Sequence, residues 1–355
     1  MKSSVRSRGT VAALGVGLCL AVLPAIPAQA QPTVSVPCNV PALRNAIIAS
    51  NASGADLSLA RNCTYTITDA YSGDDGLPQV TGTYTINGVG VTIRRSSSAE
   101  FRILHVGPTG RLTLNHVTLT GGQTEAVAGG GIYNQGSLSM TQVTVRDTRT
   151  QYGFGGALYN EGTLSMQRGA LTNNTGYLGG GILNCGTSAT LNNVTVSGNS
   201  AENGGGLNNN CQSSMALNAT RVQNNNSPEG GGIINWATLE ATGTRITSNT
   251  GWFGGGIQAA RGPVTLTDSR VTDNTASYVG GGIYVATYSG ASVALSDTRV
   301  ENNTPDNCYP PGSVVGCSNV AMSPAESPRA KHIGPEVHPR VREQLDKNPN
   351  IRLAE

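Results

Sequence analysis

The chain has 355 residues and a formal net charge of +2, and only 12% of its residues are charged. This balance gives no bulk electrostatic attraction to nucleic acid or to an anionic membrane surface. The 47 glycines recur at a fixed spacing without a collagen-like triplet, which indicates tight turns and close backbone packing.

A secretory signal is predicted at the N-terminus. Lys2, Arg6 and Arg8 give a basic start, the run Val11–Leu23 is apolar, and residues 28–30 form a small-x-small cleavage site. The alternative, a membrane anchor, needs about 20 apolar residues, which is more than this run has. We therefore predict a secreted or cell-surface protein that is cleaved near Ala30. No later segment is apolar enough to cross a membrane.

The composition then predicts three further regions along the chain. Residues 31–81 form an N-terminal cap with the first irregular turns, residues 82–319 a β-helix with regular repeats over 129–304, and residues 320–355 a Pro-rich, charged tail that we expect to be mobile. In the cap, "VPALRNAIIASN" puts Leu43, Ala46 and Ile47 on one helical face, which suits a plug for the open end of a solenoid. In the tail, "VREQLDKN" predicts one short helix.

The β-helix prediction comes from an internal repeat. Seven triplets of the form GGG or GGA, each followed by Ile or Leu, occur at intervals of 24 to 26 residues. An alternating stretch such as "ATLNNVTV" and an Asn turn such as "SGNSA" follow in each unit. This period indicates a solenoid, and the alternation indicates strands rather than helices. The leucine-rich repeat frame is absent. The sequence therefore predicts an all-β fold: a single right-handed parallel β-helix.

Residues at the same position of successive turns should stack into columns at about 4.8 Å spacing. One predicted column is apolar and points inward: Ile132, Leu158, Ile182, Leu207, Ile233, Ile257 and Ile283. Two others are rows of Asn at corners: Asn134, Asn160, Asn184, Asn209 and Asn235, and Asn174, Asn199, Asn225, Asn249, Asn274 and Asn303. Ligand contact is the alternative, but corner positions favour hydrogen bonds among the Asn side chains and with the turns.

The six cysteines outside the predicted signal suggest disulfides, because their number is even and the chain is predicted to be exported. Cys185 and Cys211 lie one turn apart at nearly the same position, which puts their Cα atoms within disulfide range. Of the fifteen possible pairings, the solenoid favours Cys185–Cys211 in the middle, Cys38–Cys63 at the start and Cys308–Cys317 at the end. No metal site is predicted, because no Cys-x-x-Cys or close His spacing occurs.

The GGG/GGA-Ile/Leu units from Gly129 to Gly282 and the Asn turns resemble the repeats of polymorphic outer membrane proteins. They are also similar to secreted bacterial right-handed β-helix proteins of pectate-lyase-like architecture. "CNVPALRNAI" is similar to the Cys-Ser-Leu-Arg-Glu-Ala-type start of some of these proteins, with an insertion after the cysteine and Asn45 in place of Glu. The resemblance covers about half of the chain. It implies the fold, but the architecture hosts adhesins, structural proteins and polysaccharide lyases alike.

Four arginines fall at the same position of successive turns: Arg221, Arg245, Arg270 and Arg299. A column of like charges is unfavourable unless it is screened or paired, and Asp268 and Asp297 lie two residues before the last two arginines. An anion-binding stripe for uronate or sulfated sugars is one interpretation. The other is a solvated face covered by long Arg side chains.

Two glutamates, Glu202 and Glu229, precede the glycine triplet in consecutive turns. Two carboxylates about 5–6 Å apart suit a retaining glycosidase or half of a Ca²⁺ site, so these are the candidate catalytic residues. Two exposed loop glutamates are also entirely ordinary.

Three aromatic residues, Tyr177, Trp252 and Tyr278, lie just before the triplets, and exposed flat rings are how proteins stack on sugars. The same residues also serve as ordinary packing in loops.

The regular repeat without a convergent catalytic set favours a non-catalytic extracellular or surface protein, adhesin-like, that binds glycans or proteins. The alternative is a polysaccharide lyase or glycoside hydrolase acting on an extracellular polysaccharide. We expect no cofactor, with Ca²⁺ only under the lyase alternative. The expected partners are an extracellular polysaccharide or a cell-surface protein and not nucleic acid, and we expect a monomer.

Overall fold

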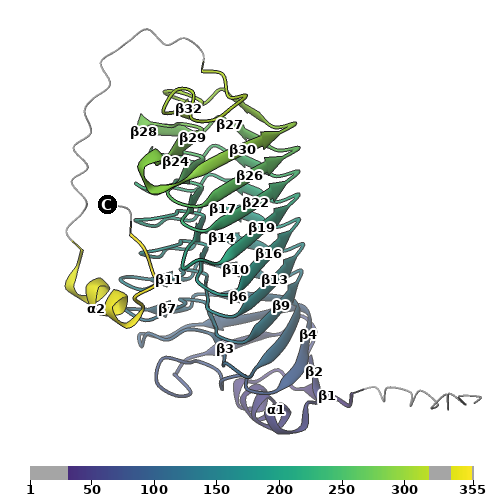
Figure 1. Cartoon of the computed structure of the whole chain (residues 1–355). Coiled ribbons are helices and arrows are strands. Elements are labelled where there is room, and N and C mark those ends of the chain that lie inside the picture. Colours follow the sequence, from purple (N-terminus) through teal and green to yellow (C-terminus); the bar gives the residue numbers. More distant parts are fainter. Residues whose placement is uncertain (1–30, 320–336, 354–355) are drawn as a thin grey trace, which may run out of the picture. The chain divides into compact units, whose positions relative to one another are not determined.

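The computed structural model describes residues 31–319 and 337–353. The described chain coils into a parallel β-solenoid of about 11 turns (Figure 1). The predicted all-β fold, a parallel β-helix with an N-terminal helical cap, is therefore confirmed. The predicted signal at 1–30 and the part of the tail at 320–336 lie outside the described residues.

The N-terminal end is closed by α1 (Val40–Ser53), which lies against the first strands, β1 (Thr33–Val36), β2 (Asp56–Leu59) and β3 (Thr64–Ile67). Asn39 caps the helix, because its side-chain oxygen accepts from the Ala42 N–H at 2.8 Å, and Gly54 ends it in the left-handed region. Leu43 and Ile47 are fully buried, with Ala46 packed beside the core as predicted. The helix thus covers core that the first turn would leave open to water.

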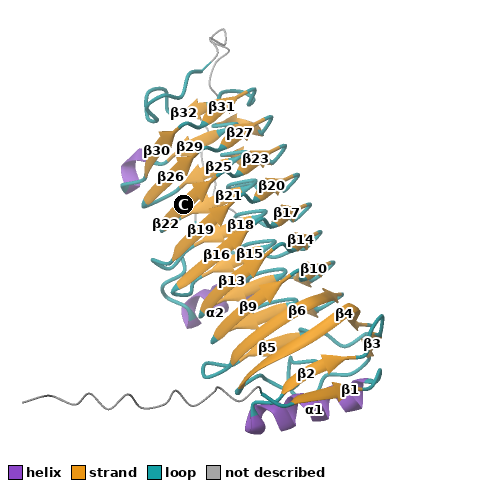
Figure 2. Cartoon of the chain, turned by 90° about the vertical axis from the view of Figure 1, so that its right-hand side faces the viewer, coloured by secondary structure: helices purple, strands orange, loops and turns teal. Residues whose placement is uncertain are grey.

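Each regular turn has three strands, and each strand pairs in parallel with its counterpart in the next turn (Figure 2). The first row begins with the long strands β4 (Thr83–Arg95) and β6 (Arg111–Thr120) and continues with β9 (Ser137–Thr141), β13 (Thr163–Gln167), β16 (Ser188–Asn192), β19 (Ser214–Asn218), β22 (Thr238–Thr242), β26 (Pro263–Thr267) and β30 (Ser292–Ser296). The second row contains β10 (Thr144–Arg146), β14 (Ala170–Thr172), β17 (Thr195–Ser197), β20 (Arg221–Gln223), β23 (Arg245–Thr247), β27 (Arg270–Thr272) and β31 (Arg299–Glu301). The third row contains β5 (Leu104–Val106), β8 (Ile132–Asn134), β12 (Leu158–Asn160), β15 (Ile182–Asn184), β18 (Leu207–Asn209), β21 (Ile233–Asn235), β25 (Ile257–Ala259), β29 (Ile283–Val285) and β32 (Cys308–Tyr309).

The smaller elements are four lateral strands and a 3₁₀ turn. The strands are β7 (Gln123–Thr124), β11 (Arg149–Thr150), β24 (Thr250–Phe253) and β28 (Thr275–Val279), and the turn is η1 (Thr287–Ser289).

The corner between the first and second rows is a single residue in the left-handed region. Ala219, Gly243 and Asp268 occupy this corner in three successive turns, with φ of 49°, 59° and 48°. Because this conformation reverses the side-chain alternation locally, the chain bends without a loop and both rows keep their apolar residues inside.

The apolar column predicted from the triplets forms the core, since all seven of its side chains are fully buried. Both Asn columns also lie at corners and hydrogen-bond along the axis. The side-chain amide of each Asn donates to the side-chain oxygen of the next at 2.6–2.9 Å, from Asn134 to Asn235 in one column and from Asn174 to Asn303 in the other. The second column also donates to strand carbonyls, as Asn225 does to Val196 at 3.0 Å. These bonds satisfy polar groups that the corners bury.

The three predicted disulfides are present. Cα–Cα distances are 5.8 Å for Cys38–Cys63, 4.8 Å for Cys185–Cys211 and 6.3 Å for Cys308–Cys317. The first joins the cap to the first turns, the second joins two adjacent middle turns, and the third joins the two ends of the last loop.

Within the described residues, no helix is long and apolar enough to cross a membrane.

The C-terminal segment, residues 337–353, contains α2 (Pro339–Lys347), which includes most of the helix predicted in the tail. Ile351 packs with Tyr159 and Leu183 in a second apolar cluster on the outer side of the third row. The backbone of Arg352 is held by the side chain of Asn210, which accepts from its N–H and donates to its carbonyl, both at 2.9 Å. An amide that pairs with a backbone in both directions imitates one step of a β-ladder.

We expect Ile351→Asp to release this segment, because a buried aliphatic side chain is replaced by a charge that needs water. The segment should then be cut at least about tenfold faster in limited proteolysis, since cleavage follows the population of the open form. The control is Glu343→Gln, which removes only an exposed ion pair with Lys347. Equal cleavage rates for both variants and the parent would contradict the packing role of Ile351.

Candidate binding site

A lateral loop leaves each regular turn after the second Asn column and returns at the glycine triplet. Outgoing residues stack from turn to turn, as Thr175, Ser200 and Asn226 do, and so do returning residues such as Leu178, Asn203 and Glu229. In two places the loops pair as strands, β7 with β11 and β24 with β28, and single bridges join the loops between them. The glycines are required where the loop rejoins the strand. At Gly231, for example, a Cβ would lie 2.3 Å from the Thr250 carbonyl oxygen of the next turn.

A groove of about 630 Å³ runs along these loops, and we call it the lateral groove. Its aromatic residues are Tyr152, Tyr177 and Trp252, and Glu202 contributes a carboxylate. Small polar side chains complete the lining: Gln151, Ser200, Asn226, Ser227, Thr250 and Ser277. His338 of the C-terminal segment closes one part of it by stacking on Tyr152 at 4.1 Å between ring centroids. Flat rings beside amides, hydroxyls and one carboxylate are the chemistry that recognises a sugar ring.

The surroundings of Tyr177 in the groove favour the protonated form of its phenol. Burial, and secondly the charge of Glu202, raise the pKa of Tyr177 above its ordinary value. Tyr177 therefore stays protonated well above neutral pH and can donate a hydrogen bond. Trp252 is 46% exposed, so much of its ring surface is available to a ligand.

The three aromatic residues singled out in the sequence do not all share one position. Tyr177 and Trp252 line the lateral groove, whereas Tyr278 does not. The Tyr278 ring instead packs edge-on against Trp252 at 6.2 Å and lies 5.2 Å from Phe253. The register of β24 against β28 shifts at this point, since Gly251 pairs with Ala276 but Phe253 with Val279. The extra residue turns Tyr278 from the groove into a support for Trp252.

The two candidate catalytic glutamates are offset by one position. Glu229 pairs in register with Asn203, so its neighbour across the ladder is the residue after Glu202. Consecutive strand residues point to opposite sides, and accordingly Glu202 is exposed in the lateral groove while Glu229 is only 5% exposed. Glu229 accepts from the Gln258 side chain at 2.7 Å, on the side of the third row. The structure therefore separates the two carboxylates.

The four arginines do form a column. Arg221 pairs with Arg245, Arg245 with Arg270, and Arg270 with Arg299, each as the first residue of its second-row strand, and all four are exposed. The ion pairing suggested by Asp268 and Asp297 does not form, since no carboxylate of a described residue lies within 4 Å of these guanidiniums.

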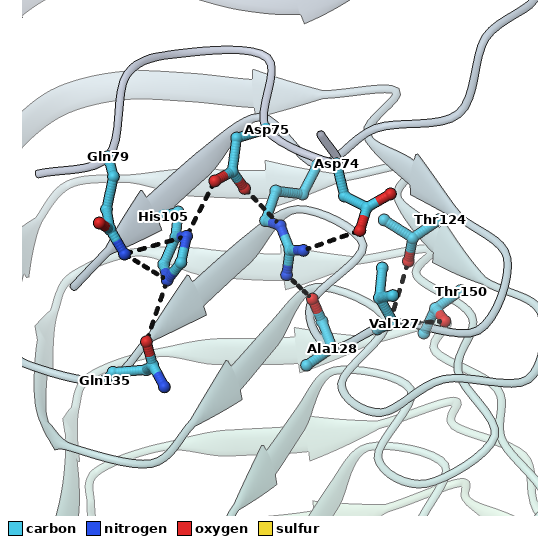
Figure 3. Close-up of polar contacts among 10 residues, drawn as sticks. Asp74, Asp75, Gln79, His105, Thr124, Val127, Ala128, Gln135 and Thr150 are labelled. Carbon is cyan, nitrogen blue, oxygen red and sulfur yellow. Dashed lines mark hydrogen bonds and ion pairs between the residues drawn. The ribbon is translucent and has the colours of Figure 1, made fainter. Parts of the chain in front are cut away.

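A polar cluster on the early turns escaped the sequence analysis (Figure 3). Asp75 forms an ion pair with Arg102, at 2.7 Å from Nε, and its other oxygen lies 2.9 Å from His105 Nδ1, so one carboxylate joins both side chains. His105 Nε2 lies 3.1 Å from the amide of Gln79 and 3.2 Å from Gln135 Oε1. Both ring nitrogens are thus engaged, which suits a clamp between the irregular and the regular turns rather than a free general base.

The cluster continues into the third row. The His105 ring stacks on Tyr133 at 4.8 Å, and the hydroxyls of Tyr133 and Tyr159 both donate to Glu161. Desolvation is the main cause that raises the pKa of each phenol, with the Glu161 charge adding to it. A sequence signal existed, because "RILHVG" aligns with the "GGGIYN" units and places His105 in the column of Tyr133 and Tyr159. Asp75 carries no such signal, since it lies on an irregular turn.

No group of three or more His, Cys, Asp or Glu side chains within the described ranges is placed to hold a metal ion.

Fold and site together define this chain as a parallel β-solenoid with an aromatic-lined lateral groove. Compared with protein-family models, with curated proteins and with solved structures, the chain matches none of them. The resemblance to polymorphic outer membrane protein repeats and to pectate-lyase-like proteins therefore rests on the sequence motifs alone, and it stays a prediction.

Proposed function

We propose that the protein is a secreted or cell-surface β-helix protein, non-catalytic, that binds a saccharide chain in the lateral groove. The proposal rests on the position of two aromatic side chains. Tyr177 and Trp252 belong to different turns of the same stack of lateral loops, and they line one groove with Glu202 between them. A groove built from stacked turns is elongated along the solenoid axis, which suits a chain of sugar rings better than a single small molecule. The three disulfides suit an oxidising compartment outside the cytoplasm.

The alternative, a polysaccharide lyase or glycoside hydrolase, needs an acid and a base that converge on one bond. Among the residues that the structure describes, Glu202 supplies the single carboxylate of the lateral groove, and the one-residue offset turns Glu229 away from it. The arrangement of these residues therefore favours binding over hydrolysis.

Replacing Trp252 by alanine is expected to weaken saccharide binding by about tenfold or more, because the ring supplies the largest flat apolar surface in the groove. Binding is measured by affinity electrophoresis with three neutral polysaccharides, a soluble β-glucan, a mannan and a xylan, and polygalacturonate is added only for the product assays below. Tyr288→Ala is the matched control, since Tyr288 is 82% exposed and lies outside the groove.

The same incubations are assayed for new reducing ends and for the absorbance of unsaturated products. Neither should appear. Appearance of either product would overturn the non-catalytic proposal, and equal binding by the Trp252 variant and the parent would overturn the assignment of the groove.

A further inference from the structure

The arginine ladder, defined as Arg221, Arg245, Arg270 and Arg299, has no role in the proposed saccharide site. These residues begin β20, β23, β27 and β31, and none of them lines the lateral groove. The four strands stack one above another (Figure 2). Because they pair in register, the arginines occupy the same position of successive turns, at about 4.8 Å per turn. The result is a straight file of guanidiniums parallel to the solenoid axis.

The charge of the ladder is poorly balanced by the protein itself. Asp268 and Asp297 lie at the corners before Arg270 and Arg299, and Glu301 ends β31, but none of these carboxylates comes within 4 Å of a ladder guanidinium. The corresponding corners before Arg221 and Arg245 are Ala219 and Gly243. Like charges on directly neighbouring strand positions repel each other. An anion lying along the file would remove that repulsion.

The surroundings of the ladder select the kind of anion. The residues that share its face, two positions along each strand, are Gln223, Thr247, Thr272 and Glu301, so hydrogen-bonding side chains flank the file. The four strands contain no aromatic residue on which a base could stack, as proteins that bind single-stranded nucleic acid use. Guanidinium groups instead match carboxylate and sulfate in a forked geometry.

We propose that the arginine ladder is a second binding site, for a linear acidic polysaccharide that lies along the solenoid axis. Its carboxylate or sulfate groups would each pair with a guanidinium of a successive turn. The site is independent of the lateral groove, because the two share no residue.

The test measures binding of the purified protein to polygalacturonate and to dextran sulfate from about 50 to about 300 mM NaCl. The double variant Arg245→Gln/Arg270→Gln should bind at least about tenfold more weakly at the lowest salt. The slope of log affinity against log salt should become shallower by about one for each arginine removed. Arg61→Gln/Arg111→Gln is the matched control, because both residues are exposed and the net charge changes equally. It should keep the affinity of the parent.

Three results would overturn the ladder as this site. They are an unchanged affinity and slope in the ladder variant, an equal loss in the control, or tighter binding to a single-stranded oligodeoxynucleotide than to either polysaccharide. Circular dichroism and the thermal midpoint confirm that each variant is folded. Trp252→Ala should leave acidic-polysaccharide binding at the ladder intact, so failure of this proposal and failure of the lateral-groove proposal are distinguishable.

Discussion

Asn225→Ala is expected to lower the free energy of unfolding by about 4 kcal/mol, although it removes only a small polar side chain. The Asn225 amide donates to Asn249 Oδ1 at 2.9 Å and to the Val196 carbonyl at 3.0 Å. Its oxygen accepts from the backbone and the side chain of Asn199, at 3.0 and 2.9 Å. Alanine leaves these partners buried without hydrogen bonds, at about 1–3 kcal/mol for each group that water cannot reach. Neighbouring turns on both sides lose bonds, so the effect is not confined to one turn.

The matched control is Asn218→Ala, which breaks a similar Asn–Asn bond on the surface. Asn218 donates to Asn192 Oδ1 at 2.8 Å, but both side chains are accessible to water, which replaces the bond. We expect a change within about 0.5 kcal/mol. Urea titration followed by circular dichroism gives both values. Similar destabilisation by the two substitutions would show that burial of the Asn column does not determine its contribution to stability.

The repeat made the fold predictable because each turn confirms the next. The inward column, the two Asn columns and the Cys185–Cys211 disulfide all depend on one quantity, the number of residues per turn, and that number can be counted in the sequence. Each repeat in the sequence therefore gives independent evidence for the same number of residues per turn, and so for the same fold.

The candidate site was less predictable, because the side to which a loop residue points depends on how many residues separate it from the Asn corner of its own turn. Glu202 is the third residue after Asn199, whereas Glu229 is the fourth after Asn225, and strand alternation then sends them to opposite sides. Counting from the Asn corner rather than judging the distance to the triplet would have shown this offset. Tyr177 is the third residue after Asn174, and Trp252 is the third after Asn249. They therefore occupy the same position of the loop as Glu202, and both line the groove.

The cluster around Asp75 could not be found in this way. Asp75, Arg102 and Gln79 belong to turns before the regular repeat, whose lengths differ, so no period relates them. Their proximity depends on how the irregular turns pack on the first regular one. Only His105 falls on a column that the later turns define.

Gly231→Ala is expected to cost about 3 kcal/mol of stability, the second large effect, and the cause is space rather than backbone conformation. Its φ is not positive, but a Cβ there would lie 2.3 Å from the Thr250 carbonyl oxygen and 2.6 Å from that of Gly255. Both atoms belong to the backbone of the next turn. The clash can be relieved only by separating two turns that are joined by ladder hydrogen bonds and packed at interior density.

Gly243→Ala separates the two possible reasons for a glycine. Gly243 has φ of 59°, yet a Cβ at this corner would meet nothing closer than 3.9 Å. The preceding turn already has Ala219 at the same corner with φ of 49°, so this fold accepts alanine there. We expect a change within about 1 kcal/mol, because strain in the left-handed region is offset by the lower entropy of the unfolded chain. Thermal unfolding of the two variants decides between these reasons. If Gly243→Ala lowers the thermal midpoint more than Gly231→Ala does, glycine is needed in this fold mainly for its backbone conformation. The opposite order assigns the glycines of the triplets to the close approach of successive turns.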